Sequence, residues 1–342
     1  DGSVVRCATV RGHFMRHSMW VQMVIGLFTL GSVPLQNHSG AEEAAAVAAP
    51  VRLEVVPAVV RVVGQRDAQQ VLVSAHYADG TIRDLTRHAF YEAGSDALVV
   101  VNAMGRVVGK KDGTGQLIIQ AAGVETMVPF TVSEMGAELP VSFRREVMPV
   151  LSAAGCSDIR CHGAPSGKDG FLLSLWGFEP EFDFRQLTRD AFGRRTNTLD
   201  PENSLILMKP LALMPHIGGR RFREGSIWAR ILTQWQAEGM RDDPQRGDLQ
   251  SIQVTPAQRV LHAPADAQQL AVYATFRDGT TVDVTQLTQF TSSDLGVAGI
   301  EASGLVQFHA QGEVAVLCRY QGAMVSARLM HIAAPHAEYQ WN

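Results

Sequence analysis

Two stretches of the chain, 51–133 and 251–334, carry the short alternating runs of apolar and polar residues that indicate β-strands. In the first stretch the apolar run Val71–Tyr77 leads into Asp79-Gly80, and the second stretch repeats this arrangement around Asp278-Gly279. An Asp-Gly pair between two β-rich runs is a strong hairpin signal, because the tight turn requires positive φ. Short strands at this spacing predict an antiparallel β-sandwich in each stretch.

The two stretches are copies of each other, and we call them the first repeat (51–133) and the second repeat (251–334). Residues 199 positions apart match in type, including Pro57 and Pro256, Asp79 and Asp278, Asp84 and Asp283, and Gly105 and Gly304. The Asp-Gly-Thr hairpin, the Asp-x-Thr that follows it and a later Gly-x-Val step resemble the bacterial immunoglobulin-like group 2 domain. This resemblance implies an immunoglobulin-like sandwich in each repeat.

Between the repeats, at 140–246, the apolar residues recur with a helical period. Phe143, Val147 and Leu151 fall on one face of a predicted helix, which Pro149 is expected to kink or shorten. The predicted fold class is therefore multidomain, with two all-β sandwiches flanking an all-α domain.

Residues 1–45 have the pattern of a signal peptide followed by a linker. Arg6, Arg11 and Arg16 precede an apolar run at 19–33, and no acidic residue lies between Asp1 and Glu42. A basic segment followed by an apolar run of this length is typical of a secretory signal, and the run is shorter than a spanning helix requires. The sequence thus predicts export to the periplasm or cell envelope, with an uncleaved membrane anchor left open.

Composition narrows the class of protein further. The formal net charge is −4 and hydrophobic residues make up 46% of the chain, which is typical of globular domains. A nearly neutral chain argues against a dedicated nucleic-acid binder, which needs a basic surface. Four cysteines are too few for a disulfide-stapled scaffold.

The candidate chemistry is concentrated in Cys156, Cys161 and His162, which form a C-x4-C-H pattern. Two thiols followed at once by a histidine suit covalent attachment of a haem, in which the histidine is the proximal iron ligand. A structural zinc site is a weaker alternative, since it needs four nitrogen or sulfur ligands. A simple disulfide between the two cysteines is the other alternative.

This segment resembles the cytochrome c domain of large multidomain proteins of planctomycete type. The matching stretches include Gly155–Ala164, Gly167–Leu175, Pro201–Leu207 and Pro215–Phe222. The resemblance implies one covalent haem c held by Cys156 and Cys161, with His162 as the proximal ligand. It favours His216 as the distal ligand, with Met214 as the alternative. Arg220 and Arg221 are candidate partners of the haem propionates, because a guanidinium suits bidentate carboxylate binding, and a solvated basic turn is the alternative.

The function expected from these features is one-electron transfer by an exported c-type cytochrome domain protein. Its redox partner is not identified, and the immunoglobulin-like repeats are expected to contact a cell-surface or envelope partner. No nucleophile–base pair or carboxylate dyad is visible, so no intrinsic enzyme activity is assigned. Two alternatives stay open: an extracytoplasmic binding or scaffold protein, and the electron-transfer front end of a larger enzyme whose C-terminal part is missing.

Overall fold

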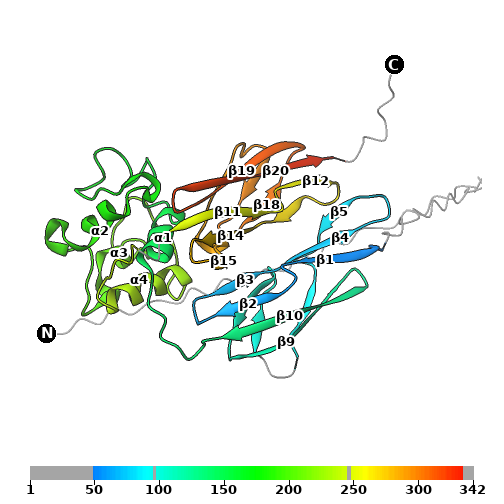
Figure 1. Ribbon diagram of the computed structural model, residues 1–342. Helices are drawn as coiled ribbons and strands as arrows, with labels where there is room; N and C mark the ends of the chain where they lie inside the picture. The colour runs from blue at the N-terminus through cyan, green and yellow to red at the C-terminus, as the bar shows by residue number, and fades with distance from the viewer. Residues whose placement is uncertain (1–48, 95–97, 245–247, 334–342) are drawn as a thin grey trace, which may run out of the picture. The chain divides into compact units, whose positions relative to one another are not determined.

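The computed structural model describes residues 49–94, 98–244 and 248–333 (Figure 1). The predicted signal peptide and linker, 1–45, lie outside the described residues. Strands account for 38% of the described residues and helices for only 17%, so β-structure dominates in this part of the chain. Among the described residues, none of the helices has the length and apolar character needed to cross a membrane.

The first repeat folds into three small sheets, with strand orders β1-β4-β5, β2-β10-β9-β6 and β3-β8-β7. Its strands are β1 Arg52–Val56, β2 Val60–Val63, β3 Ala68–Gln70, β4 Leu72–His76, β5 Ile82–Asp84, β6 Phe90–Glu92, β7 Val99–Val101, β8 Arg106–Gly109, β9 Gly113–Ala121 and β10 Val124–Ser133. The predicted hairpin at Asp79-Gly80 is confirmed, and Gly80 adopts a φ of 83° there. The sandwich is not purely antiparallel, because β2 pairs with β10 in parallel register.

The second repeat has the same topology, with strand orders β11-β14-β15, β12-β20-β19-β16 and β13-β18-β17. Its strands are β11 Leu249–Thr255, β12 Gln258–His262, β13 Ala267–Gln269, β14 Ala271–Phe276, β15 Thr281–Asp283, β16 Gln289–Ser292, β17 Ala298–Ile300, β18 Leu305–Phe308, β19 Gly312–Tyr320 and β20 Ala323–Ile332. Each repeat encloses its own apolar core between the sheets. The two repeats are therefore two β domains of one topology.

The segment between the repeats is built around four short helices, and we call it the helical module (141–244). They are α1 Met148–Ala153, α2 Pro180–Thr188, α3 Leu205–Met208 and α4 Ile227–Ala237 (Figure 1). Single turns of π- or 3₁₀-helix occur at Phe143–Val147, Leu175–Gly177, Asp190–Gly193, Pro201–Asn203 and, in the second repeat, Thr285–Leu287. The module has its own core, in which the Phe143 ring stacks on Trp235 with centroids 5.3 Å apart.

The prediction of an all-α central domain is wrong. Apart from the single turn at Leu175–Gly177, the backbone between α1 and α2 consists of turns, and Gly155, Gly167 and Gly170 adopt positive φ there. Positive φ interrupts a right-handed helix, so the apolar periodicity of this segment extends only over short pieces. Phe143, Val147 and Leu151, which the sequence places on one helical face, are all buried.

The two repeats contact each other through an exchange of equivalent side chains. Asp84 accepts a hydrogen bond from the backbone N–H of Gln269, and Asp283 accepts one from the backbone N–H of Gln70 at 2.5 Å. The side-chain amide of the preceding glutamine donates to the same carboxylate oxygen in each case, at 3.1 and 3.3 Å. The glutamines belong to β3 and β13, which lie at sheet edges. Each carboxylate therefore caps an edge strand of the other repeat, and we call this contact the reciprocal clamp.

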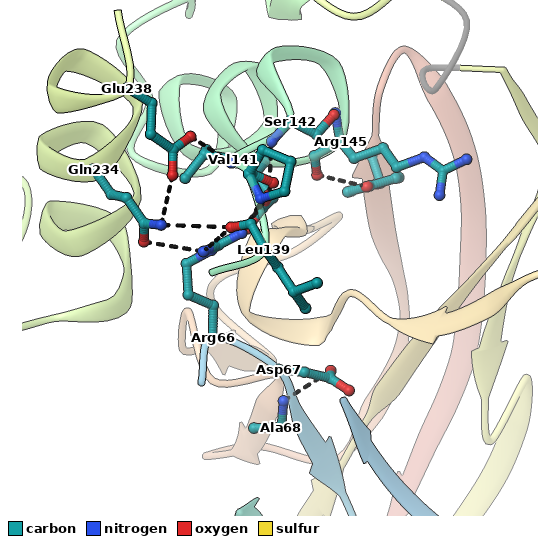
Figure 2. Close-up of polar contacts among 12 residues, drawn as sticks. Arg66, Asp67, Ala68, Leu139, Val141, Ser142, Arg145, Gln234 and Glu238 are labelled. Atoms are coloured by element: carbon teal, nitrogen blue, oxygen red, sulfur yellow. Dashed lines mark hydrogen bonds and ion pairs between the residues drawn. The ribbon is translucent and has the colours of Figure 1, made fainter. Parts of the chain in front are cut away.

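Arg66 of the first repeat joins that repeat to the helical module (Figure 2). Its Nε donates to Glu146 at 2.8 Å, and its Nη1 donates to the carbonyl of Leu139 at 2.9 Å and to the side chain of Gln234 at 3.0 Å. The Arg66 side chain is only 15% exposed. Because the N–H groups of this guanidinium are hydrogen-bonded to groups outside the first repeat, Arg66 fixes the first repeat and the helical module in one orientation.

Candidate functional site

The loop that carries the two cysteines closes on itself through its backbone. The N–H of His162 donates to the carbonyl of Cys156 at 3.0 Å, and the N–H of Cys161 donates to Asp158 at 2.9 Å. The carbonyl of His162 accepts a hydrogen bond from Leu173 at 2.8 Å, which ties the loop to the extended segment that follows. The four residues between the cysteines therefore form a compact turn.

A cavity of about 80 Å³ lies beside this loop, with walls from α1, α3, α4 and the segment 209–222. Five of the seven predicted site residues line it: Cys156, Cys161, His162, His216 and Arg221. Met214 and Arg220 do not line the cavity, and Met214 is 36% exposed at the surface. The sequence prediction therefore identified residues that the fold brings together over more than 50 positions of chain.

The two histidines of the cavity lie opposite each other. Their ring centroids are 6.5 Å apart and the ring planes differ by only 7°. Nδ1 of His162 hydrogen-bonds the carbonyl of Phe171 at 3.1 Å, and Nδ1 of His216 hydrogen-bonds the carbonyl of Gly219 at 3.1 Å. A carbonyl requires a proton on Nδ1, so the neutral tautomer of each ring leaves an Nε2 lone pair free to bind a metal.

Burial lowers the pKa of His162, and the neighbouring His216 lowers it further, whereas the hydrogen bond to Phe171 opposes the shift. Lowering this pKa keeps the imidazole neutral at physiological pH, which is the protonation state that ligates metals.

The cavity cysteines are free thiols, and they are partly buried. Burial raises the pKa of Cys156 to about 11, against the opposing effect of the Arg221 charge. A thiol with a raised pKa is a poor nucleophile, because the thiolate is the reactive form. The third described cysteine, Cys318, is fully buried in the core of the second repeat and its pKa is raised to about 12, as expected for an inert thiol.

Arg221 connects the histidine-bearing segment to the end of α1. Its Nε donates to the carbonyl of Ala154 at 2.5 Å, and its Nη1 lies 3.4 Å from the carbonyl of Gly218. Gly155 makes this approach possible, because a Cβ at that position would lie 2.2 Å from Nη2 of Arg221. Gly155 also adopts a φ of 73°, which suits glycine.

Neither the two rings nor the free space suits the predicted haem. The lone pair of an imidazole Nε2 lies in the ring plane, so two stacked rings with centroids 6.5 Å apart do not direct both nitrogens at one metal ion. The cavity volume of about 80 Å³ is also well below the roughly 300–1,000 Å³ of pockets that hold drug-sized ligands.

A zinc site of the usual kind is not formed here. Among the described residues, no group of three or more histidine, cysteine, aspartate or glutamate side chains is placed to hold a metal ion. His162 follows Cys161 directly, and the turn does not direct these side chains and Cys156 toward a common point. The three-ligand cluster considered from the sequence is therefore not assembled.

Comparisons with known proteins give a likeness in β architecture only. No family of known proteins matches the sequence, and no curated protein matches it either. Domains 5–6 of the S-layer protein SbsC match at a TM-score of 0.32 and 12% identity, covering 82% of this chain and 99% of that one. Extracellular domains 3–5 of Drosophila OTK match at 0.18 and 9%, covering 84% and 66%. Human protocadherin-24 EC1-2 matches at 0.18 and 7%, covering 84% and 100%.

These findings correct the family expected from the sequence. The chain does not belong to the planctomycete-type cytochrome c proteins, because its architecture is mainly β and no family match supports the assignment. The electron-transfer role of a cytochrome c, which was expected from that family, falls with it. The C-x4-C-H spacing and the stretch Pro215–Phe222 are short motifs, and short motifs constrain only local backbone.

Sequence reasoning missed the groups that orient the site. The carbonyl of Phe171 fixes the tautomer of His162, and the Phe171 ring lies 4.5 Å from the imidazole. Arg66 and Glu146, which hold the helical module to the first repeat, were also missed. Backbone carbonyls and single arginines leave no pattern in a sequence, so no signal could have found them.

Proposed function

We propose that this chain is an exported binding or scaffold protein in which two immunoglobulin-type β repeats hold a helical module in a fixed position. The observation that carries the proposal is the bonding between the parts. The reciprocal clamp joins the repeats, Arg66 joins the first repeat to the helical module, and the indole of Trp228 donates to the carbonyl of Gln286 in the second repeat at 2.7 Å. Rigid placement of this kind supports presentation of a surface.

Export is part of the same proposal. It is supported by the basic segment and apolar run at 1–33, which have the order of a secretory signal. We also propose that the two repeats contact a partner at the cell surface or in the cell envelope.

Co-sedimentation tests the proposal directly. The full chain is mixed with purified envelope fractions from the source cells, either intact, protease-treated or stripped of polysaccharide. We expect the chain to pellet with the intact fraction and to lose binding in one treated arm, which identifies a protein or a glycan partner. A variant that breaks the clamp, Asp84→Asn, should bind more weakly if rigidity matters. A chain that stays in the supernatant in every arm would remove the proposal.

A further inference from the structure

The two repeats present equivalent surfaces at the base of their Asp-Gly hairpins. Tyr77 of the first repeat and Phe276 of the second lie 199 positions apart, and both rings are buried. An arginine covers each ring: Cζ of Arg83 lies 4.5 Å from the Tyr77 centroid, and Cζ of Arg145 lies 3.7 Å from the Phe276 centroid. Both repeats therefore use the same cation–π contact at the same place.

The two arginines come from different parts of the chain. Arg83 belongs to the first repeat itself, on β5, whereas the equivalent residue of the second repeat is Val282. The guanidinium over Phe276 is supplied by Arg145 of the helical module, which also donates to Asp278 at 2.7 Å. The arginine over the ring therefore comes from the same repeat in the first repeat, and from the helical module in the second repeat.

Two further contacts occur only where the helical module is bound. The hydroxyl of Tyr320 donates to the carbonyl of Arg145 at 2.7 Å, and the amide of Gln321 donates to the carbonyl of Arg144 at 2.8 Å. The residues equivalent to Tyr320 and Gln321 in the first repeat are alanines, at positions 121 and 122. We call Phe276, Asp278, Tyr320 and Gln321 the docking socket.

We propose that position 282 and its equivalent, position 83, decide which repeat receives the helical module. Valine at 282 leaves the Phe276 ring open, so that Arg145 can enter the docking socket. Arginine at 83 occupies the matching ring in the first repeat and closes it against a second guanidinium. The occupant of the open socket is the chain's own helical module, through Arg145.

The charges around the socket agree with this assignment. Asp278, in the hairpin, forms an ion pair with Arg145. Glu146, the residue after Arg145, forms an ion pair with Arg66 of the first repeat. An additional guanidinium from position 282 would compete with Arg145 for both the ring and Asp278, and the two like charges would repel each other.

The experiment introduces the first repeat's residue into the second repeat of the full chain, as Val282→Arg. Val282 borders a cavity of about 600 Å³ between the repeats and the helical module, so a longer side chain has room. The readout is solvent exchange of the Trp228 indole N–H, which belongs to the helical module and donates to Gln286 of the second repeat across the same interface. We expect at least tenfold faster exchange.

Two matched variants separate charge from bulk and one repeat from the other. Val282→Met adds length without charge, and Arg83→Val opens the first repeat's ring; neither should change Trp228 exchange. In a cycle with Arg145→Ala, the alanine substitution should accelerate exchange in the parent chain and have little effect in a chain that already carries Val282→Arg.

Three results would overturn the proposal. These are unchanged Trp228 exchange in Val282→Arg, an equal effect of Val282→Met, and full additivity with Arg145→Ala. Loss of protection at the Val272 amide, which donates to Thr285 within the second repeat, would mean that Val282→Arg has disturbed the second repeat itself. In that case Val282→Lys, with the same charge on a more flexible stem, replaces it and is held to the same outcomes.

Discussion

The reciprocal clamp makes a prediction that can be worked through atom by atom. Asp84 accepts three N–H groups: those of Gln269 and Gln268 from the second repeat, and the backbone N–H of Thr86 at 2.8 Å. Asn at position 84 keeps the oxygen that faces Thr86 but places an NH₂ group against the two donors of the second repeat. Gln268 and Gln269 are at most 2% exposed, so water does not replace the lost acceptor.

The magnitude follows from the number of donors left without a partner. Each buried unsatisfied donor costs about 1–3 kcal/mol, so two donors cost about 2–6 kcal/mol. Removing a buried charge offsets part of this, because burial already disfavours the ionised form and raises the pKa of Asp84. We therefore expect Asp84→Asn to weaken the contact by about 2–4 kcal/mol.

Amide hydrogen exchange at Gln269 measures this loss where it occurs. A loss of about 2 kcal/mol in local opening free energy corresponds to roughly 30-fold faster exchange. The equivalent variant Asp283→Asn should have the same effect at the Gln70 amide, because the geometry is repeated there. Asp248→Asn removes a charge from an exposed carboxylate and should leave both amides unchanged. Unaltered Gln269 exchange in Asp84→Asn would show that the carboxylate does not hold the second repeat.

Three further substitutions probe the helical module. Burial raises the pKa of Asp183 to about 6, so its contribution to stability is greatest below about pH 4 and is lost as pH rises through about 6. In urea denaturation from about pH 4 to 7, the free energy of unfolding should therefore decline less steeply for Asp183→Asn than for the parent chain. Parallel curves of unfolding free energy against pH would contradict this. Gly155→Ala should lower the melting temperature more than Gly239→Ala. Both glycines have positive φ, but only at position 155 would the added Cβ contact a side chain, that of Arg221. Equal shifts in melting temperature would exclude a clash with Arg221. Phe143→Ala removes a fully buried ring and should cost about 3–5 kcal/mol in the same urea assay, whereas a loss under about 1 kcal/mol would mean the core closes around the gap.

Features set by neighbouring residues could be predicted from the sequence. The Asp-Gly hairpins form where predicted, with φ of 83° at Gly80 and 84° at Gly279, because the turn is decided by two residues. The buried face of Phe143, Val147 and Leu151 was found from helical spacing. Each of these features depends on a stretch of no more than about ten residues.

Features set by distant residues could not be predicted. The parallel pairing of β2 with β10 joins residues 70 positions apart, and no local pattern marks it. The all-α prediction failed because apolar spacing does not show where glycines adopt positive φ between short helices. At the candidate site, Cys156, Cys161 and His162 are neighbours in sequence and were found together. His216 was added through its motif, and the carbonyl that orients His162 had no signal.

The residues that join the two repeats are identical in both copies, whereas the residues that face the helical module differ. The clamp residues are the same in both copies, Asp84 with Asp283 and Gln70 with Gln269, and a contact that each repeat makes to the other requires both to keep the same groups. The residues that face the helical module differ, as at Tyr320, whose equivalent in the first repeat is an alanine. Because the module can bind only one of two equivalent surfaces, the asymmetry must be encoded in such differences. The identical positions cannot supply it, since they would offer the module the same contacts on either side.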